Sequence, residues 1–203
     1  MAEHAEQQPP HEPPDIAAAL GGPLGMLESA LPPAAFVLSH TVVGLESTPS
    51  ALIALGIGVL LTLARLARGQ TLQFAVSGLA GVGIAAFIVA RTGKAENFFL
   101  PGLLANAAYA TACVASNVVR RPAVGLVLGS LAGEPTKPPL GQNAPEYRRA
   151  TWMWAGLFSL RLTVQVPLYL ADALVALGTT RVAMGLPLYA LGLWATYLLT
   201  RAR

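Results

Sequence analysis

Hydrophobic side chains fill most of this chain in long runs that short polar connections separate. A helix that crosses a bilayer needs roughly 17–25 mainly apolar residues. The runs of sufficient length predict six transmembrane helices, at residues 31–47, 49–66, 71–90, 97–119, 150–176 and 182–200. The expected fold class is therefore an all-α, polytopic membrane helix bundle.

Two further apolar stretches do not fit a simple crossing. Residues 122–133 are too few to span a bilayer alone, so they predict a short re-entrant or interfacial helix. Its glycines recur at every fourth position (Gly125, Gly129 and Gly133), which favours close approach of another helix. Residues 16–29 are broken by Gly and Pro and predict an interfacial or partly inserted helix.

The domain organisation expected from composition is simple. Residues 1–15 are rich in Glu, Gln and Pro, and predict a disordered N-terminal tail. Residues 16–203 then form a single transmembrane helical domain. The whole chain is 54% hydrophobic and 11% charged, with a mean hydropathy of +0.57. These values favour lipid over water as the surrounding solvent.

The charges predict an orientation in the membrane. Residues 16–203 hold thirteen basic and six acidic side chains, a net charge of +7. The excess lies in short connections and forms no basic face with interleaved aromatic residues, so nucleic acid is not an expected partner. With both termini cytoplasmic and residues 122–133 not crossing, nine basic residues lie inside; the three outside are Arg91, Lys94 and Arg181. The positive-inside rule thus predicts a multi-pass protein of the bacterial plasma membrane, in contact with lipids and with other membrane proteins or a second copy.

Arg161 is the one charge near the centre of a predicted span. A helical spacing places a polar and aromatic ribbon on one face of that span, made of Trp154, Phe158, Arg161, Gln165, Leu168 and Asp172, with Tyr169 beside it. An intramembrane charge costs about 2.5–3.5 kcal/mol, so Arg161 should face the bundle interior or a water-filled cavity. Three interpretations remain open: a buried ion pair that serves packing, a polar pocket or ion path, and a position at the interface. Glu28 and Glu134 are the candidate ion-pair partners.

Polar residues in the span 97–119 could contact this ribbon. Asn106 and Tyr109 lie on neighbouring turns and could form hydrogen bonds across the bundle. Such bonds contribute about 0.6 kcal/mol on average, so a packing role is favoured.

No motif predicts a cofactor, a metal or a known catalytic centre. The chain has no P-loop, GxGxxG, HExxH, GxSxG or DDxxD pattern. The three histidines and the single cysteine are too scattered to predict a metal site.

The order of the motifs resembles two families of membrane proteins. The motif NFFLPG, the Arg120–Arg121–Pro122 step and the Trp-containing span around Trp152 and Trp154 resemble the intracellular septation protein A family. The segments FFLPGLLANAAY, TWMWAGLFSLRLTVQVPLYLA and GLPLYALGLW resemble, more closely, an actinobacterial multi-pass membrane family of unknown function. The resemblance covers most of residues 24–200. It implies a part in cell-envelope maintenance and division through contacts with other membrane proteins, although Arg161 departs from the septation pattern.

Three functional hypotheses follow. The leading one is a non-enzymatic role in envelope or division assembly through helix–helix contacts. The second is a metal-independent membrane cyclase or isomerase acting on an isoprenoid or lipid, with Asp172, Glu46 or Glu28 as proton donor and Arg161, Trp154, Phe158 and Tyr169 lining the pocket. The third is a small transporter with Arg161 as anion anchor. A cavity that holds Arg161, a carboxylate and several aromatic rings would favour the enzyme, and a solid bundle with Arg161 fully paired would favour assembly.

Overall fold

The computed structural model describes residues 22–69, 72–131 and 144–201, and within these ranges it contains helices and no strands. The helices are α2 (Gly22–Thr41), α3 (Ser47–Ala67), α4 (Leu72–Thr92), the 3-10 helix η1 (Ala95–Phe99), α5 (Leu100–Val118), α6 (Ala123–Leu131), α7 (Pro145–Leu170), α8 (Leu174–Ala183) and α9 (Leu186–Arg201). The expected N-terminal tail and Glu134 lie outside the described residues.

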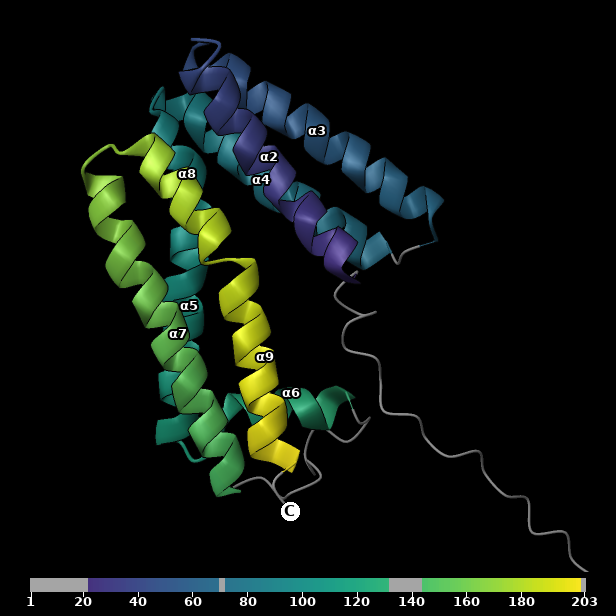
Figure 1. Cartoon of the computed structure of the whole chain (residues 1–203), viewed down its shortest axis with the longest axis vertical. Coiled ribbons are helices and arrows are strands. Elements are labelled where there is room, and N and C mark those ends of the chain that lie inside the picture. The colour runs from purple at the N-terminus through teal and green to yellow at the C-terminus, as the bar shows by residue number, and fades with distance from the viewer. Residues whose placement is uncertain (1–21, 70–71, 132–143, 202–203) are drawn as a thin grey trace, which may run out of the picture.

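The helices form two packed groups (Figure 1). One group contains α2, α3 and α4, and the other contains α5, α7 and α9. The short elements η1 and α8 join the groups, since η1 contacts α4 and α5 and α8 contacts α2 and α7. Gly178 allows the close approach of α8 to α2, because a Cβ at this position would lie 2.8 Å from Cγ2 of Val37.

Three segments of the described chain are long and apolar enough to cross a membrane. They are Ser47–Ala67, Ala95–Val118 and Leu174–Thr200, and the shorter apolar helix Val76–Thr92 accompanies them. The prediction of six spans is therefore supported for three segments. The expected span at residues 150–176 is not among them, because Arg161 and Gln165 lower the mean hydropathy of α7.

Several predicted boundaries were wrong. The first long helix begins by Gly22, so it includes Pro32 and Pro33 in its interior instead of starting beside them. Helix α7 ends at Leu170, and Asp172 adopts a left-handed φ of 52° in the turn before α8. Asp172 therefore does not continue the polar face of α7 as the spacing had predicted.

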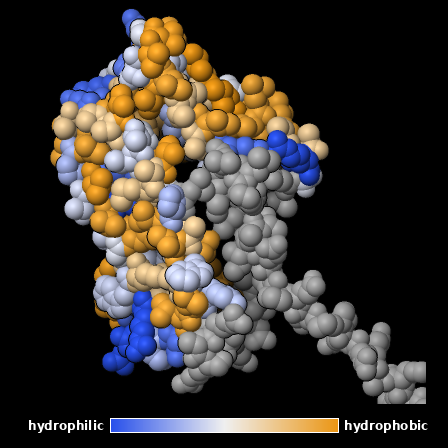
Figure 2. All heavy atoms as spheres, viewed as in Figure 1, coloured by the Kyte–Doolittle hydropathy of each residue, from blue (hydrophilic) through white to orange (hydrophobic). Residues whose placement is uncertain are grey.

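The packing of α3 shows how these apolar helices associate. Its buried residues are small or polar, namely Ser50, Ala51, Ala54, Gly58 and Thr62. Large side chains such as Leu52, Leu60 and Leu63 are exposed. Hydrophobic residues likewise cover much of the visible surface (Figure 2). Small residues inside and large apolar residues outside are typical of helices that pack together in lipid.

Helix α6 lies across the end of the second group (Figure 1). Its first amides are capped by side chains of neighbouring helices, because the N–H of Ala123 donates to Ser116 Oγ at 3.1 Å and that of Val124 to Thr151 Oγ1 at 3.2 Å. Gly125 faces Tyr147, and a Cβ there would lie 2.9 Å from the ring. The close helix contact expected at the glycines is thus present at Gly125, against Tyr147 of α7. The first amides of α6 are also held by side chains of α5 and α7.

A carboxylate clamp ties α2 to the end of α3. Arg65 Nε donates to Glu28 Oε2 at 3.0 Å, and Arg68 Nη1 donates to Glu28 Oε1. The hydrogen bonds from Arg68 and Arg65 hold the pKa of Glu28 below its ordinary value. Glu28 is therefore the partner of Arg65 and Arg68, and not of Arg161.

We expect Glu28→Gln to lower stability in detergent by about 1–3 kcal/mol, since two charge-assisted hydrogen bonds weaken. A lowered carboxyl pKa stabilises the fold at pH values above the ordinary value of 4.5 and ceases to do so as pH falls through the folded value. The thermal midpoints of the parent and the variant should therefore differ at neutral pH and converge in acid.

Glu46→Gln is the matched control, because Glu46 forms no ion pair among the described residues. A midpoint of Glu28→Gln equal to that of the parent at neutral pH would contradict a stabilising clamp.

Candidate functional site: a cavity with two arginines

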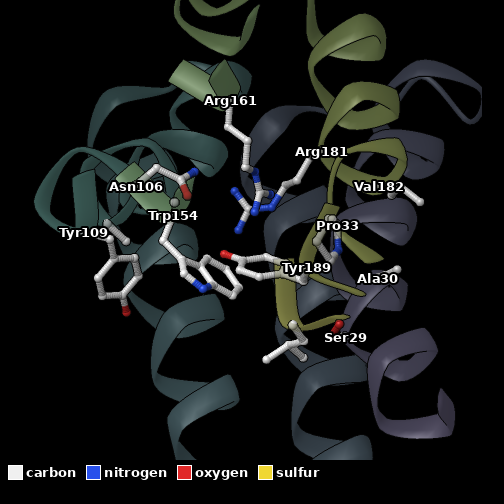
Figure 3. A pocket seen from close by; sticks show the side chains of 14 residues that line it. Ser29, Ala30, Pro33, Asn106, Tyr109, Trp154, Arg161, Arg181, Val182 and Tyr189 are labelled. Atoms are coloured by element: carbon white, nitrogen blue, oxygen red, sulfur yellow. The ribbon is translucent and has the colours of Figure 1, made fainter. Parts of the chain in front are cut away.

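A cavity of about 530 Å³ lies where the two helix groups meet (Figure 3). Helices α2, α5, α7, α8 and α9 all contribute to its walls. The lining residues are Ser29, Ala30, Pro33, Gly102, Ala105, Asn106, Tyr109, Trp154, Arg161, Arg181, Val182, Gly185, Tyr189 and Leu193. Most of them are apolar or aromatic, and two are arginines.

Arg161 enters the cavity from α7. Its residue is 6% exposed, and its Nε has no hydrogen-bond partner among the described residues. The guanidinium carbon lies 5.0 Å from the centre of the Tyr189 ring, in a cation–π contact. The ring fixes the position of the guanidinium but leaves its N–H groups available to a ligand.

Arg181 enters the same cavity from α8. Its guanidinium lies 5.7 Å from the centre of the Phe99 ring and rests against the backbone of α5 at Gly102. A Cβ at Gly102 would lie 2.1 Å from Nη1 of Arg181, so a larger residue would displace the guanidinium. The expected place of Arg181 in a connection between spans was wrong, because the residue lies within α8 and its side chain lines the same cavity as Arg161.

The two positive charges have no acidic partner in the described chain. Its ion pairs are Arg65–Glu28, Arg68–Glu28 and Lys94–Glu96. None of its carboxylates lines the cavity. Because both guanidinium groups line the same cavity, their like charges repel each other. Cation–π contacts contribute about 0.5–2 kcal/mol each, which is less than the several kcal/mol that desolvation of each ion costs.

Trp154 forms a fixed aromatic wall below the arginines (Figure 3). Its Nε1 donates to Thr196 Oγ1 at 3.0 Å, and Gly192 permits the indole to approach α9, since a Cβ there would lie 3.0 Å away. The Tyr189 ring lies 5.9 Å from the Trp154 ring, centre to centre. These contacts between α7 and α9 place the aromatic rings before any ligand enters.

Asn106 adds a third polar group to the cavity. It is 6% exposed, and its side chain lines the cavity. In the close view its amide points toward the part of the cavity that holds Arg161 (Figure 3). Donors thus reach the cavity from α5, α7 and α8.

Sequence comparison assigns the chain to a family. The profile described as "Protein of unknown function (DUF3159)" matches residues 20–203. The chain belongs to the DUF3159 family. No curated protein and no solved structure matches it. The match includes every residue that lines the cavity, so the site lies within the DUF3159 domain.

The structure brings together some of the residues that the sequence singled out. Among the pocket candidates, Arg161, Trp154, Asn106 and Tyr109 line the cavity of this DUF3159 protein. Phe158 does not line the cavity but packs against two residues that do. Its ring centre lies 5.4 Å from that of Tyr109 and 5.7 Å from that of Trp154.

Other candidates lie elsewhere. Gln165 is 1% exposed, does not line the cavity, and has an Nε2 without a partner in the described chain. The hydroxyl of Tyr169 donates to Asn97 Oδ1, which ties α7 to η1. Of the proposed proton donors, Glu46 precedes α3 and Asp172 is exposed in the turn after α7, so neither lines the cavity.

Two important residues were missed by reasoning from the sequence, Arg181 and Tyr189. A signal was present, because Arg181, Gly185, Tyr189 and Leu193 recur at every fourth position and all line the cavity. Arg181 lies on α8, whereas Tyr189 and Leu193 lie on α9, so the two short helices present this spacing to the cavity across the break at Gly185. The predicted boundary at residue 182 concealed this pattern by assigning Arg181 to a loop.

We expect Arg161→Met to raise the thermal midpoint of the delipidated protein in phosphate- and sulfate-free buffer. The substitution removes one desolvated charge and its repulsion on Arg181, and buried charges replaced by apolar residues of similar size are often neutral or stabilising by about 1–4 kcal/mol. Arg181→Met should act in the same direction.

The double variant should gain less than the sum of the single gains, because the repulsion can be removed only once. Arg91→Met, at an exposed arginine outside the cavity, is the control. A midpoint that falls with Arg161→Met would indicate that Arg161 is a stabilising, paired charge.

Proposed function

We propose that this DUF3159 protein is a multi-pass plasma-membrane protein that binds an anionic amphiphile in the cavity between its two helix groups. The observation that carries the proposal is the pair Arg161 and Arg181, which share one cavity without a carboxylate among the described lining residues. An anion would supply the missing negative charge.

The membrane part of the proposal is supported by three apolar segments long enough to cross a bilayer and by the exposed large side chains of α3. The charge distribution supports cytoplasmic termini. With Arg181 in the cavity, Arg91 and Lys94 are the remaining basic residues on the proposed outer side. The excess of basic residues in the proposed inner connections over those on the outer side therefore becomes larger.

The binding part rests on the chemistry of the cavity. Guanidinium groups offer several N–H donors in a planar fork, which matches the oxygens of a phosphate or carboxylate. The volume of about 530 Å³ lies within the usual range of small-molecule sites. Apolar walls that include Pro33, Val182 and Leu193 suit the hydrocarbon part of the same molecule.

The other hypotheses receive different support. An acid–base cyclase or isomerase needs a proton donor at its substrate, and the described lining residues include no carboxylate. A small transporter with Arg161 as anion anchor requires the same anion site, and is the second candidate for that reason. A role in envelope or division assembly stays a prediction, and a lipid-binding protein could perform it.

We expect the purified protein in nonionic detergent to retain phosphatidic acid and phosphatidylglycerol in preference to phosphatidylcholine, as measured by native mass spectrometry. Arg161→Met and Arg181→Met should each weaken retention of the anionic lipids by about tenfold or more, which corresponds to the loss of one charged hydrogen-bonding group.

Arg91→Met is the matched control, since it removes the same charge from an exposed position outside the cavity. Equal retention of phosphatidylcholine and the anionic lipids by the parent, unchanged by either cavity substitution, would refute the proposal.

A further inference from the structure

We infer that the preferred anion is a phosphate monoester carrying two negative charges, rather than a phosphodiester carrying one. This inference rests on the proposed function and specifies the chemical class of its ligand. It follows from the number of charges in the cavity and from the number and placement of the donors around it.

The charge balance favours a dianion. Arg161 and Arg181 bring two positive charges into an apolar cavity, and the described lining residues bring none of the opposite sign. A phosphodiester would neutralise one guanidinium and leave the other uncompensated. A phosphate monoester carries a charge of about −1.5 to −2 at pH 7 and neutralises both.

The donors also match a monoester in number. Arg161, Arg181 and Asn106 approach from three different helices, and the buried Nε of Arg161 has no hydrogen-bond partner among the described residues. A phosphate monoester has three terminal oxygens, whereas a diester has two. A monoester can therefore direct one terminal oxygen toward each of the three donor residues, whereas two donor residues must share a terminal oxygen of a diester.

The remaining walls receive the organic part of the ester. Below the arginines lie the rings of Trp154 and Tyr189, and Pro33 of α2 and Leu193 of α9 add apolar surface. These walls offer apolar contacts to an alkyl or prenyl chain. The shared ligand chemistry is the monoester dianion, and the apolar walls favour its lipid-borne form over free phosphate.

Fluorescence of Trp154 provides a direct assay, because this indole lines the cavity. The reporter protein carries Trp152→Phe and Trp194→Phe, at two exposed positions outside the cavity. In nonionic detergent at pH 7.5 it is titrated with lysophosphatidic acid, with lysophosphatidylglycerol and with inorganic phosphate. We expect lysophosphatidic acid to bind at least about tenfold more tightly than lysophosphatidylglycerol, a difference of 1.4 kcal/mol.

The pH dependence provides a second readout. The second pKa of a phosphate monoester is about 6, so its preference over the diester should diminish when the pH is lowered from about 7.5 to about 5.5. The titratable groups that face the anion from the described elements are Arg161, Arg181, Tyr109 and Tyr189. No histidine or carboxylate of the described chain lines the cavity, so the change reports the ligand.

Two variants test the geometry while both charges remain. Gly102→Ala displaces the Arg181 guanidinium, and Asn106→Leu removes the third donor. Each should reduce the preference for the monoester by about fivefold or more, the effect of losing one hydrogen bond of roughly 1 kcal/mol. Gly81→Ala is the control, because a Cβ there meets no atom within 4 Å. Unchanged thermal midpoints establish that the variants are folded.

The outcomes separate the inference from the proposed function. Equal affinities for the two lysolipids, both dependent on Arg161, would overturn the dianion inference and leave anion binding intact. Absence of arginine-dependent binding by all three ligands would overturn both. Inorganic phosphate that binds as tightly as lysophosphatidic acid would support the dianion and identify free phosphate as its source.

Discussion

The constraint on which this structure depends is the cost of keeping two like-charged guanidinium groups together in an apolar cavity. Other elements hold them there. Gly102 gives Arg181 room against α5, and the Tyr189 ring lies beneath Arg161. The break between α8 and α9 needs a residue without a side chain at Gly185, where a Cβ would lie 2.9 Å from the carbonyl oxygen of Arg181. Charged side chains that are buried at such a free-energy cost are typical of functional sites.

The distribution of carboxylates explains why the two charges stay uncompensated. Glu28 lies next to the cavity-lining Ser29, but its oxygens accept hydrogen bonds from Arg65 and Arg68 at the end of α3. Asp172 follows Arg161 in the chain, but the left-handed turn after α7 leaves it exposed. Glu28 thus joins two helices and Asp172 is exposed in a turn, so neither compensates the positive charge of the cavity.

The long apolar elements could be predicted closely where a continuous run ended at a strong polar or glycine signal. Residues 49–66 and 71–90 correspond to α3 and α4 within a few positions. Prediction failed where a break depended on a single backbone conformation. Nothing in the local pattern required Asp172 to adopt a positive φ.

The sequence by itself determined that this chain is helical, that its surfaces are apolar, and that Arg161 cannot point into lipid without a large cost. Those properties follow from hydropathy and helical period, which are local to each segment. Only the tertiary structure decided that Arg181, twenty residues farther along, meets Arg161 in one cavity. Their meeting depends on how α5, α7, α8 and α9 cross, and the crossing is set by contacts such as Gly192 against Trp154 that join distant parts of the chain.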